Sequence, residues 1–339
     1  MRRILVLVCV CALVLAACGG SGKKSAAKAD GTPKPTTSTT KPAPLVAPLT
    51  GLPSPGNVAN TRCVVTVKID NTPTSQPKAG IDQADVVWEE VVEYNITRLA
   101  AMFNSQAPNV VGKVRSVRRT DQALVWPVKG VFAYSGGAQY AVDSINTAPV
   151  VQLDESRAGS MMFRDHTRRA PYNLFAHVDQ MYSACKSPAP PPLFIYRAKG
   201  EVALGAPASS ATVAYKNGYA VTWKYNPATG GWTRIIFGRP EVVSSGATLE
   251  PKNVVVMTVN YVGGDPRPAH LGVGAEAQLV GTGPLQVFTA GKVIKGTWSR
   301  PDKEHPAKLL DATGNEIKLT PGQTFVELPD PTMPVTSTP

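Results

Sequence analysis

The first eighteen residues constrain the rest of this chain more than any other segment does. They read MRRILVLVCVCALVLAAC, in which Arg2 and Arg3 precede an apolar run from Ile4 to Leu15 and small residues precede Cys18. A basic start, an apolar centre and a small-residue end are typical of an export signal, and the apolar run is too short for a lasting membrane span. We therefore predict that residues 1–17 are a signal peptide and that the remaining chain folds outside the cytoplasm.

The last four residues of this segment, LAAC, resemble the lipobox that bacterial lipoprotein processing recognises. The resemblance implies cleavage before Cys18 and acylation of that cysteine, for example with palmitate. Such an anchor would hold the protein on the extracytoplasmic face of the cell membrane, because each buried CH₂ group contributes about 0.8 kcal/mol. Secretion without an anchor and an uncleaved apolar anchor are the alternatives. No later stretch has the length of apolar sequence that a transmembrane helix needs.

Residues 18–47 are rich in Gly, Ser, Thr, Pro, Ala and Lys and contain almost nothing that a core would bury. Such a segment cannot offset its conformational entropy by burying apolar surface, so we predict a disordered, semi-extended tether. The net charge of +11 is concentrated at this end, since residues 1–50 hold seven Lys and Arg side chains but only Asp30 among the acids. Five positive charges remain for residues 51–339. A nucleic-acid binder carries its basic excess on the folded domain, so we expect no nucleic-acid partner.

The body that follows the tether has about 285 residues, which is enough for two domains. A proline cluster in KSPAPPPLFIYR, residues 186–197, would stop a helix and cannot enter a central strand. We place a boundary there. The prediction is an α+β protein with a mixed α/β N-terminal domain at 48–195, a smaller and mostly β C-terminal domain at 196–332, and a loose tail at 333–339.

Hydrophobic patterning supplies the expected elements. In the first half, apolar runs predict strands at 63–69, 84–92, 97–103 and 131–137. Residues 173–186 carry apolar side chains at helical spacing, which predicts an amphipathic helix with Cys185 on its buried face. In the second half, alternating segments predict a hairpin at 220–237, strands at 253–262 and 324–328, and a second tight hairpin around Gly291 within 285–298.

Two cysteines, Cys63 and Cys185, remain once the signal and the acylated Cys18 are set aside. In an oxidising compartment they pair as a disulfide or stay as two buried free thiols, and the sequence leaves both alternatives open. Neither lies in a metal-binding pattern. The four histidines are also scattered without ligand spacing, so we predict no metal site and no cofactor.

Charged residues gather in three segments of the first half. The stretch GKVRSVRRTD at 112–121 contains Arg115, Ser116 and Arg118, and Arg guanidinium groups match carboxylate or phosphate bidentately. The second segment is Asp70 and Asn71, directly after the first predicted strand. The third contains Glu89 in the second predicted strand, Glu93 just after it, and Arg98 in the strand that follows. Glu89 and Glu93 are four residues apart, a spacing that puts them on one face of a helix or of a strand.

Three interpretations of this constellation are open. The acids and arginines neutralise one another in a structural network, they line a cleft for an anionic or zwitterionic envelope ligand, or Glu89 and Glu93 act as catalytic acid and base. Residues 51–180 carry 13 Lys and Arg side chains against 12 Asp and Glu. This near balance favours the network, in which the arginines face the domain's own carboxylates.

Several segments together resemble the YerB-like family of bacterial lipoproteins, whose members carry a domain of unknown function. The segments, in order, are PLTGLPSPG, KIDNTPTSQPKAGIDQADVVWEEVVEYNITRLAAMF, GKVRSVRRTD, SGGA, RRAPYNL, PKNVVVMTV and GTGPLQVFTAGKVIKGTWSR. The resemblance spans about residues 48–330 and implies an N-terminal domain followed by a smaller C-terminal domain, with no assigned activity. This chain has Lys113 where the family usually has proline, and Tyr94 and Asn95 where it usually has two glycines.

These observations predict a lipid-anchored extracytoplasmic protein that binds a ligand or scaffolds other components of the cell envelope. Its expected partners are the membrane, through the N-terminal anchor, and an envelope component or envelope protein. The alternative from another class is a cell-wall hydrolase that uses Glu89 and Glu93.

Overall fold

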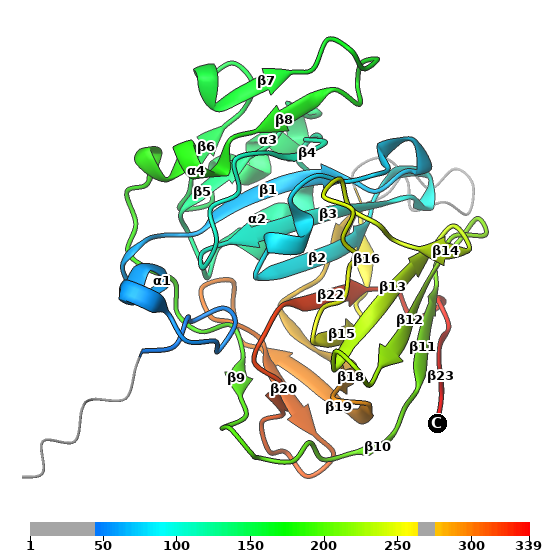
Figure 1. The fold of residues 1–339 in the computed structure, drawn as a ribbon. Coiled ribbons are helices and arrows are strands. Elements are labelled where there is room, and N and C mark those ends of the chain that lie inside the picture. The colour runs from blue at the N-terminus through cyan, green and yellow to red at the C-terminus, as the bar shows by residue number, and fades with distance from the viewer. Residues whose placement is uncertain (1–44, 264–274) are drawn as a thin grey trace, which may run out of the picture. The chain divides into compact units, whose positions relative to one another are not determined.

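A mixed sheet of eleven strands forms the centre of the computed structural model, which describes residues 45–263 and 275–339 (Figure 1). The central pairing joins the two halves of the chain, because β2 lies between β3 of the first half and β22 of the second. In spatial order the strands are β10 (Ala206–Pro207), β19 (Lys292–Arg300), β18 (Gly281–Thr289), β15 (Asn253–Met257), β22 (Thr324–Leu328), β2 (Val86–Val91), β3 (Thr97–Phe103), β1 (Val65–Asp70), β5 (Val131–Ala133) and β6 (Val151–Leu153), with β20 (Lys308–Asp311) beside β19.

The central strands are buried on both faces, which fits sequences that are mostly apolar, although each also carries one or two charged residues. Alternate residues of β1 enter different cores. Val67 and Ile69 belong to the core that also contains side chains of a second, five-stranded sheet, described below. Lys68 and Asp70 point to the opposite face of the central sheet. The sheet therefore has two distinct buried environments, and a polar residue is assigned to one of them by its position in the strand.

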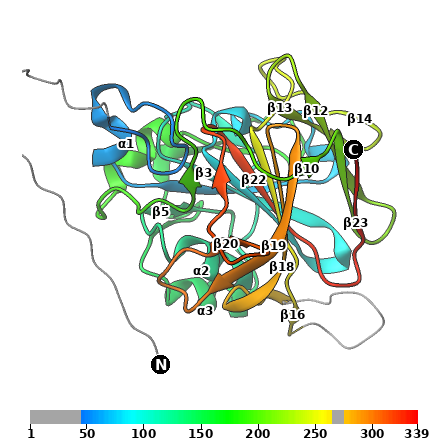
Figure 2. The same ribbon diagram turned by 90° about the horizontal axis from the view of Figure 1, so that it is seen from below.

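A five-stranded antiparallel sheet covers the first face. Its large aromatic side chains contact the central sheet, as when Trp223 packs on Phe325 with ring centroids 5.1 Å apart. In Figure 2 this sheet and the helices α2 and α3 lie on opposite sides of the central sheet. Its strands are β14 (Arg239–Pro240), β13 (Gly231–Ile236), β12 (Ala220–Asn226), β11 (Ser210–Ala214) and β23 (Val335–Thr338).

The last of these strands corrects the prediction of a loose tail at 333–339. β23 pairs antiparallel with β11, with Val335 opposite Val213. The reason lies in the tertiary structure, since β11 has a free edge where the chain ends and the β-branched residues of β23 suit a strand.

The helices are short and lie mainly in the first half of the chain, so the predicted α+β class is confirmed. Helices α2 and α3 pack on β5 around a core that contains Val125, Phe132 and Ile145. The helices are α1 (Val58–Thr61), α2 (Arg119–Val125), α3 (Gln139–Asn146) and α4 (Val178–Met181). The 3₁₀ turns are η1 (Pro55–Asn57), η2 (Pro73–Ser75), η3 (Ile81–Gln83), η4 (Glu93–Asn95), η5 (Gly159–Met161) and η6 (Tyr182–Ala184).

The amphipathic helix predicted at 173–186 is wrong in its first part. Residues 174–176 form a strand, β8, which pairs on one side with β4 and on the other with β7, and the helical turns begin only at Val178. Non-local pairing has overridden a local helical pattern. The small sheets are β4 (Val111–Gly112), β8 (Leu174–Ala176) and β7 (Met162–Arg164); β16 (Tyr261–Val262) and β17 (Glu276–Ala277); and β21 (Lys318–Leu319) and β9 (Ile195–Tyr196).

The signal peptide and the acylation site Cys18 lie outside the described residues. The tether was predicted to extend to residue 47, but Ala47 and Leu49 are buried. The amide of Ala47 donates to the carbonyl oxygen of Leu52 at 2.8 Å, and the hydroxyl of Tyr196 donates to the carbonyl oxygen of Leu49 at 2.5 Å. The folded body therefore begins before the predicted end of the tether. Within 45–263 and 275–339, no helix has the length and apolarity to cross a membrane.

Candidate anion-binding site

The arginine-rich stretch lies along the carboxyl end of β1. Three backbone hydrogen bonds hold it there: Asp70 N to Lys113 O at 3.0 Å, Arg115 N to Lys68 O at 2.9 Å, and Ser135 N to Arg115 O at 2.9 Å. Because β1 and β5 are parallel, their carboxyl ends open on the same edge of the sheet. This edge is where α/β sheets commonly place ligands.

Two of the arginines contact carboxylates of the same domain. Arg115 Nε lies 2.7 Å from Asp70 Oδ2, and Arg118 Nη2 donates to Glu93 Oε2 at 2.6 Å. The third, Arg98, lies in β3 opposite Asp70 of β1 and donates from Nη1 to the carbonyl oxygen of Ser116 at 3.1 Å. We call Arg98, Arg115 and Arg118, with Asp70 and Glu93, the arginine cluster.

The arginine cluster has more cations than anions. Its three guanidinium groups face two carboxylates, and within the described residues Arg98 forms no ion pair of its own. Burial, together with the charges of Arg118 and Arg115, lowers the pKa of Arg98 to about 10. Burial alone would raise the pKa of Glu93, but the hydrogen bond and charge of Arg118 lower it. Arg115 and Arg118 keep 19% and 11% of their side-chain surface exposed, so solutes can reach the cluster.

A second charged group lies beneath the arginine cluster and was not predicted. Lys68 is fully buried and donates to Glu90 and, at 2.6 Å, to Asp121 Oδ1. The other oxygen of Asp121 accepts the backbone N–H of Arg118 at 2.6 Å, which caps the start of α2. This group therefore fixes the position of Arg118. Its sequence signal was a lysine and a glutamate inside otherwise apolar strands.

Glu89 and Glu93 do not share a face, which corrects the prediction. β2 ends at Val91, and Glu93 lies in the turn η4. Glu89 points to the opposite side of the sheet, is fully buried and pairs with Arg234 Nη2 at 2.5 Å. Asn71 also points there and donates to Glu89 Oε1 at 2.8 Å. The candidate residues thus separate into two groups, because neighbouring positions of a strand face opposite ways.

The group around Glu89 joins the two sheets. Arg234 of β13 bonds to both Glu89 and Glu241, and Lys78 bonds to Glu241 at 2.5 Å, with all four side chains fully buried. Glu327 of β22 accepts hydrogen bonds from Tyr215 OH at 2.7 Å and Trp223 Nε1 at 3.0 Å. Burial and the charge of Glu89 raise the pKa of Glu327 to about 8. When Glu327 is protonated, the cations Lys78 and Arg234 balance the anions Glu89 and Glu241. We call this buried group the clamp, because it holds the two sheets together.

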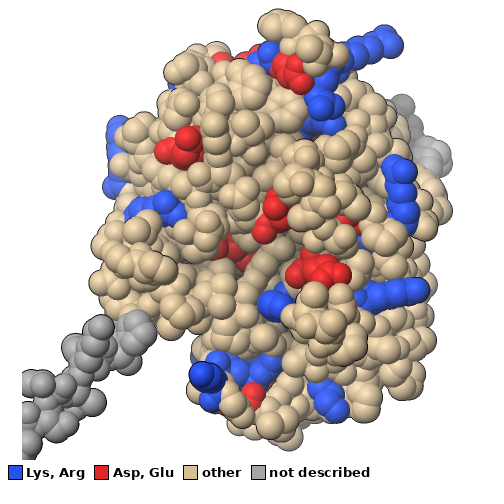
Figure 3. All heavy atoms as spheres, in the orientation of Figure 1, with Lys and Arg blue, Asp and Glu red and all other residues tan. Residues whose placement is uncertain are grey.

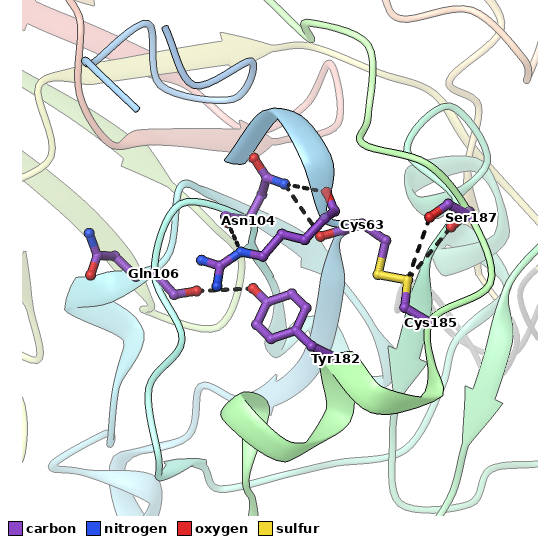
Figure 4. The surroundings of a disulfide bond; sticks show 7 residues. Cys63, Asn104, Gln106, Tyr182, Cys185 and Ser187 are labelled. Carbon is purple, nitrogen blue, oxygen red and sulfur yellow. Dashed lines mark hydrogen bonds between the residues drawn. A yellow bond between two sulfur atoms is a disulfide. The ribbon is translucent and has the colours of Figure 1, made fainter. Parts of the chain in front are cut away.

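The two remaining cysteines form a disulfide, which is one of the alternatives that the sequence left open. Cys63 and Cys185 have Cα atoms 6.4 Å apart and are separated by 122 residues in sequence. Figure 4 shows that the bond ties the start of β1 to the segment after η6. Arg62 lies over the ring of Tyr182 at 4.3 Å, and Asn104 donates to the carbonyl oxygen of Cys63 at 3.3 Å. The disulfide therefore belongs to a packed region away from the arginine cluster.

The fold and the arginine cluster define an α+β protein with two joined sheets and a cationic sheet edge. Residues 49–189 match the family described as "Protein of unknown function (DUF3048) N-terminal domain", and residues 211–326 match "Protein of unknown function (DUF3048) C-terminal domain". The chain belongs to this family, and the resemblance drawn from its sequence segments is confirmed.

Two comparisons add to the family match. Over 145 residues the chain is 34% identical to a Bacillus subtilis (strain 168) protein named "Putative lipoprotein YerB", a match that covers 42% of this chain and 43% of the relative. The aligned region thus spans less than half of that relative. The crystal structure of YerB protein from Bacillus subtilis superposes with a TM-score of 0.74 at 22% identity, covering 86% of this chain and 99% of that one. This superposition shows a shared fold.

The two departures from the family pattern fall beside the arginine cluster. Tyr94 and Asn95 occupy the turn η4 with φ angles of 59° and 56°, a left-handed conformation that glycine adopts more readily. Lys113 follows a cis peptide bond after Gly112. Its ammonium group is buried and donates to the carbonyl oxygen of Ser75 at 2.9 Å. Both departures therefore lie in segments that position the cluster.

Proposed function

We propose that this protein is a lipid-anchored, extracytoplasmic binding protein of the cell envelope. In this proposal the arginine cluster holds a phosphate or carboxylate group of the ligand. The anchor is supported by the LAAC motif before Cys18 and by similarity to a protein named as a lipoprotein. The division at 48–195 and 196–332 remains part of the proposal as two sequence domains that share one central sheet, and not as two independently folding bodies.

A buried donor without a partner in the arginine cluster carries the proposal. Arg118 Nε is buried and has no hydrogen-bond acceptor within the described residues, and such a donor calls for an explanation. Arg98 is largely buried and forms no ion pair of its own among the described residues, although the adjacent Lys68 group has one more carboxylate than cations. An anion that bridges the arginines would supply the acceptor that Arg118 lacks.

The hydrolase alternative needs Glu89 and Glu93 to face one substrate bond. Glu89 is fully buried against Arg234, and Glu93 binds Arg118 on the other side of the sheet. General acid and base groups must both reach the reacting atoms. We therefore do not retain this alternative.

Thermal unfolding of the detergent-solubilised full-length protein tests anion binding. A ligand that binds only the folded state stabilises it, by about 2.7 kcal/mol at a hundredfold excess over Kd. Inorganic phosphate, sugar phosphates and peptidoglycan fragments are compared on the wild type and on Arg115→Ala. Arg239→Ala is the matched control, because Arg239 is an exposed arginine on β14.

We expect one of these anions to raise the unfolding temperature of the wild type and of Arg239→Ala but not of Arg115→Ala. If no anion stabilises any variant and Arg115→Ala only unfolds earlier, the arginines are structural and the protein is a scaffold. The anchor has a separate test, since Cys18→Ala should release the protein from membranes, and retention there would rule the lipid anchor out.

A further inference from the structure

The loop between β7 and β8, residues 165–173, forms a rim beside the arginine cluster. Tyr172 of this loop lies against the guanidinium group of Arg115, 5.6 Å from ring centroid to Cζ. The backbone fixes this arrangement, because Val114 N donates to the carbonyl oxygen of Leu174 at 2.8 Å. Figure 1 shows the β7–β8 hairpin projecting from the central sheet next to β4. Anything bound at Arg115 therefore lies next to this loop.

The rim loop is itself cationic. Its side chains His166, Arg168 and Arg169 are exposed, and Asp165 is its one acid. Asp165 pairs with Arg168 at 2.9 Å and also accepts a hydrogen bond from Thr167 Oγ1 at 2.5 Å, which leaves Arg169 without an ion pair among the described residues. Lys and Arg side chains project from this end of the molecule in Figure 3. The loop can therefore attract a second anionic group.

The two cationic regions are continuous. Arg168 lies over the ring of Phe175, 5.9 Å from Cζ to the ring centroid, and Phe175 of β8 is paired with Gly112, the residue before Lys113. Lys113 is two residues from Arg115 in the extended segment beside β1. A row of cations thus runs from Arg118 through Arg115 to Arg168. Each of these three arginines pairs with one carboxylate, and Arg98, Lys113 and Arg169 give the row its positive excess. Such a row fits a ligand with successive negative charges better than it fits a single anion.

Tyrosines occur in or next to the segments that carry these cations. Tyr172 of the rim loop lies against Arg115, Tyr140 at the start of α3 is 36% exposed, and Tyr94, which follows Glu93 in η4, is 68% exposed. Tyr94 holds a positive φ of 59°, an uncommon conformation for a bulky residue that often marks a functional site. Exposed tyrosine rings offer an apolar face and a polar tip, which suits the stacked ring of a sugar.

We infer that the ligand is an anionic glycan that carries a phosphate or carboxylate on successive units. One negative group binds the arginine cluster, a sugar ring lies on the tyrosines, and the next negative group binds Arg168 and Arg169. This inference rests on the proposed function, because it assigns a ligand class to the same site. It adds a second anion subsite on the rim loop and gives the tyrosines a role, which is to stack on the sugar ring.

The test compares monomeric and polymeric anions on the full-length protein. The monomers are inorganic phosphate, glucose 1-phosphate and glucuronate. The polymers are a phosphomannan, in which phosphate is the anion, polygalacturonate, in which carboxylate is the anion, and linear polyphosphate, which has no sugar. Each is titrated against the wild type, the double variant Arg168→Ala/Arg169→Ala and the control Arg239→Ala.

We expect a glycan polymer to bind about tenfold or more tightly than its monomer. The double variant should lose this gain while its affinity for the monomer stays unchanged. An unchanged affinity of the double variant for every polymer would overturn the second subsite. Polyphosphate that binds as tightly as both glycans would overturn the sugar assignment. If no anion binds, monomer or polymer, the proposed function fails together with the inference.

Discussion

Removal of the disulfide between Cys63 and Cys185 should cost more stability than most single changes in this protein. The bond closes a loop of 122 residues, which spans β1 to η6 and includes most of the first half of the chain. In the chain-entropy account, closing a loop of this length in the unfolded state is worth about 5 kcal/mol. Whole domains are typically stable by about 5–15 kcal/mol. The double variant Cys63→Ala/Cys185→Ala is therefore expected to lose about 4–5 kcal/mol.

Equilibrium unfolding in urea measures this loss through the midpoint and the slope. The slope should rise as the midpoint falls, because an open unfolded chain exposes more surface than a cross-linked one. Wild-type protein kept reduced with dithiothreitol should match the double variant, which controls for packing changes at the two alanines. Amide hydrogen exchange of residues 182–187 measures the local effect of losing the disulfide, because Figure 4 shows that the bond holds this segment.

A loss below about 1 kcal/mol in both the variant and the reduced protein would refute the entropy argument. The unfolded chain would then already be confined in this region. A large loss in the variant but not in the reduced protein would instead place the effect in the packing of Cys63, which is almost fully buried.

Three further predictions concern buried groups. The folded state raises the pKa of Glu327 from about 4.5 to about 8, so wild-type stability should fall as the pH rises through this interval. Glu327→Gln stays neutral, and in urea titrations it should lose less stability than the wild type between about pH 5 and pH 9. Arg234→Met should cost about 3–5 kcal/mol in the same assay, because it leaves Glu89 and Glu241 buried without their shared cation; a loss under 1 kcal/mol would contradict the clamp. At Gly130, φ is 82° and an added Cβ would lie 2.0 Å from a backbone oxygen, so Gly130→Ala should lower the unfolding temperature by several degrees, and an unchanged temperature would show that the backbone can move there.

Sequence patterning identified the strands whose burial is set locally. The runs at 97–103 and 324–328 coincide with β3 and β22, because both are mostly apolar, are buried along their whole length and are followed by turn residues. It failed where pairing with distant segments decided the structure. Residues 174–176 became β8 through hydrogen bonds to β4 and β7, and the last residues became β23 through β11. No local pattern reports such partners.

The candidate site shows the same division. Arg115 and Arg118 do face carboxylates of their own domain, as the charge balance suggested. The expected pairing of Glu89 with Glu93 depended on where β2 ends, and the strand ends two residues before Glu93. The partner that Glu89 does have, Arg234, lies 145 residues away in sequence, so only the folded chain could reveal it.

The parallel pairing of β2 with β22 has a consequence for how the chain acquires its structure. Residues 86–90 find their partner at 324–328, close to the C-terminus, so the centre of the large sheet cannot close until nearly the whole chain is available. Contacts of such long sequence separation form slowly. Until then β2 presents an apolar open edge of the kind that recruits other chains. A fragment that stops at residue 195 would keep this edge permanently, and we expect it to aggregate rather than behave as an independent domain.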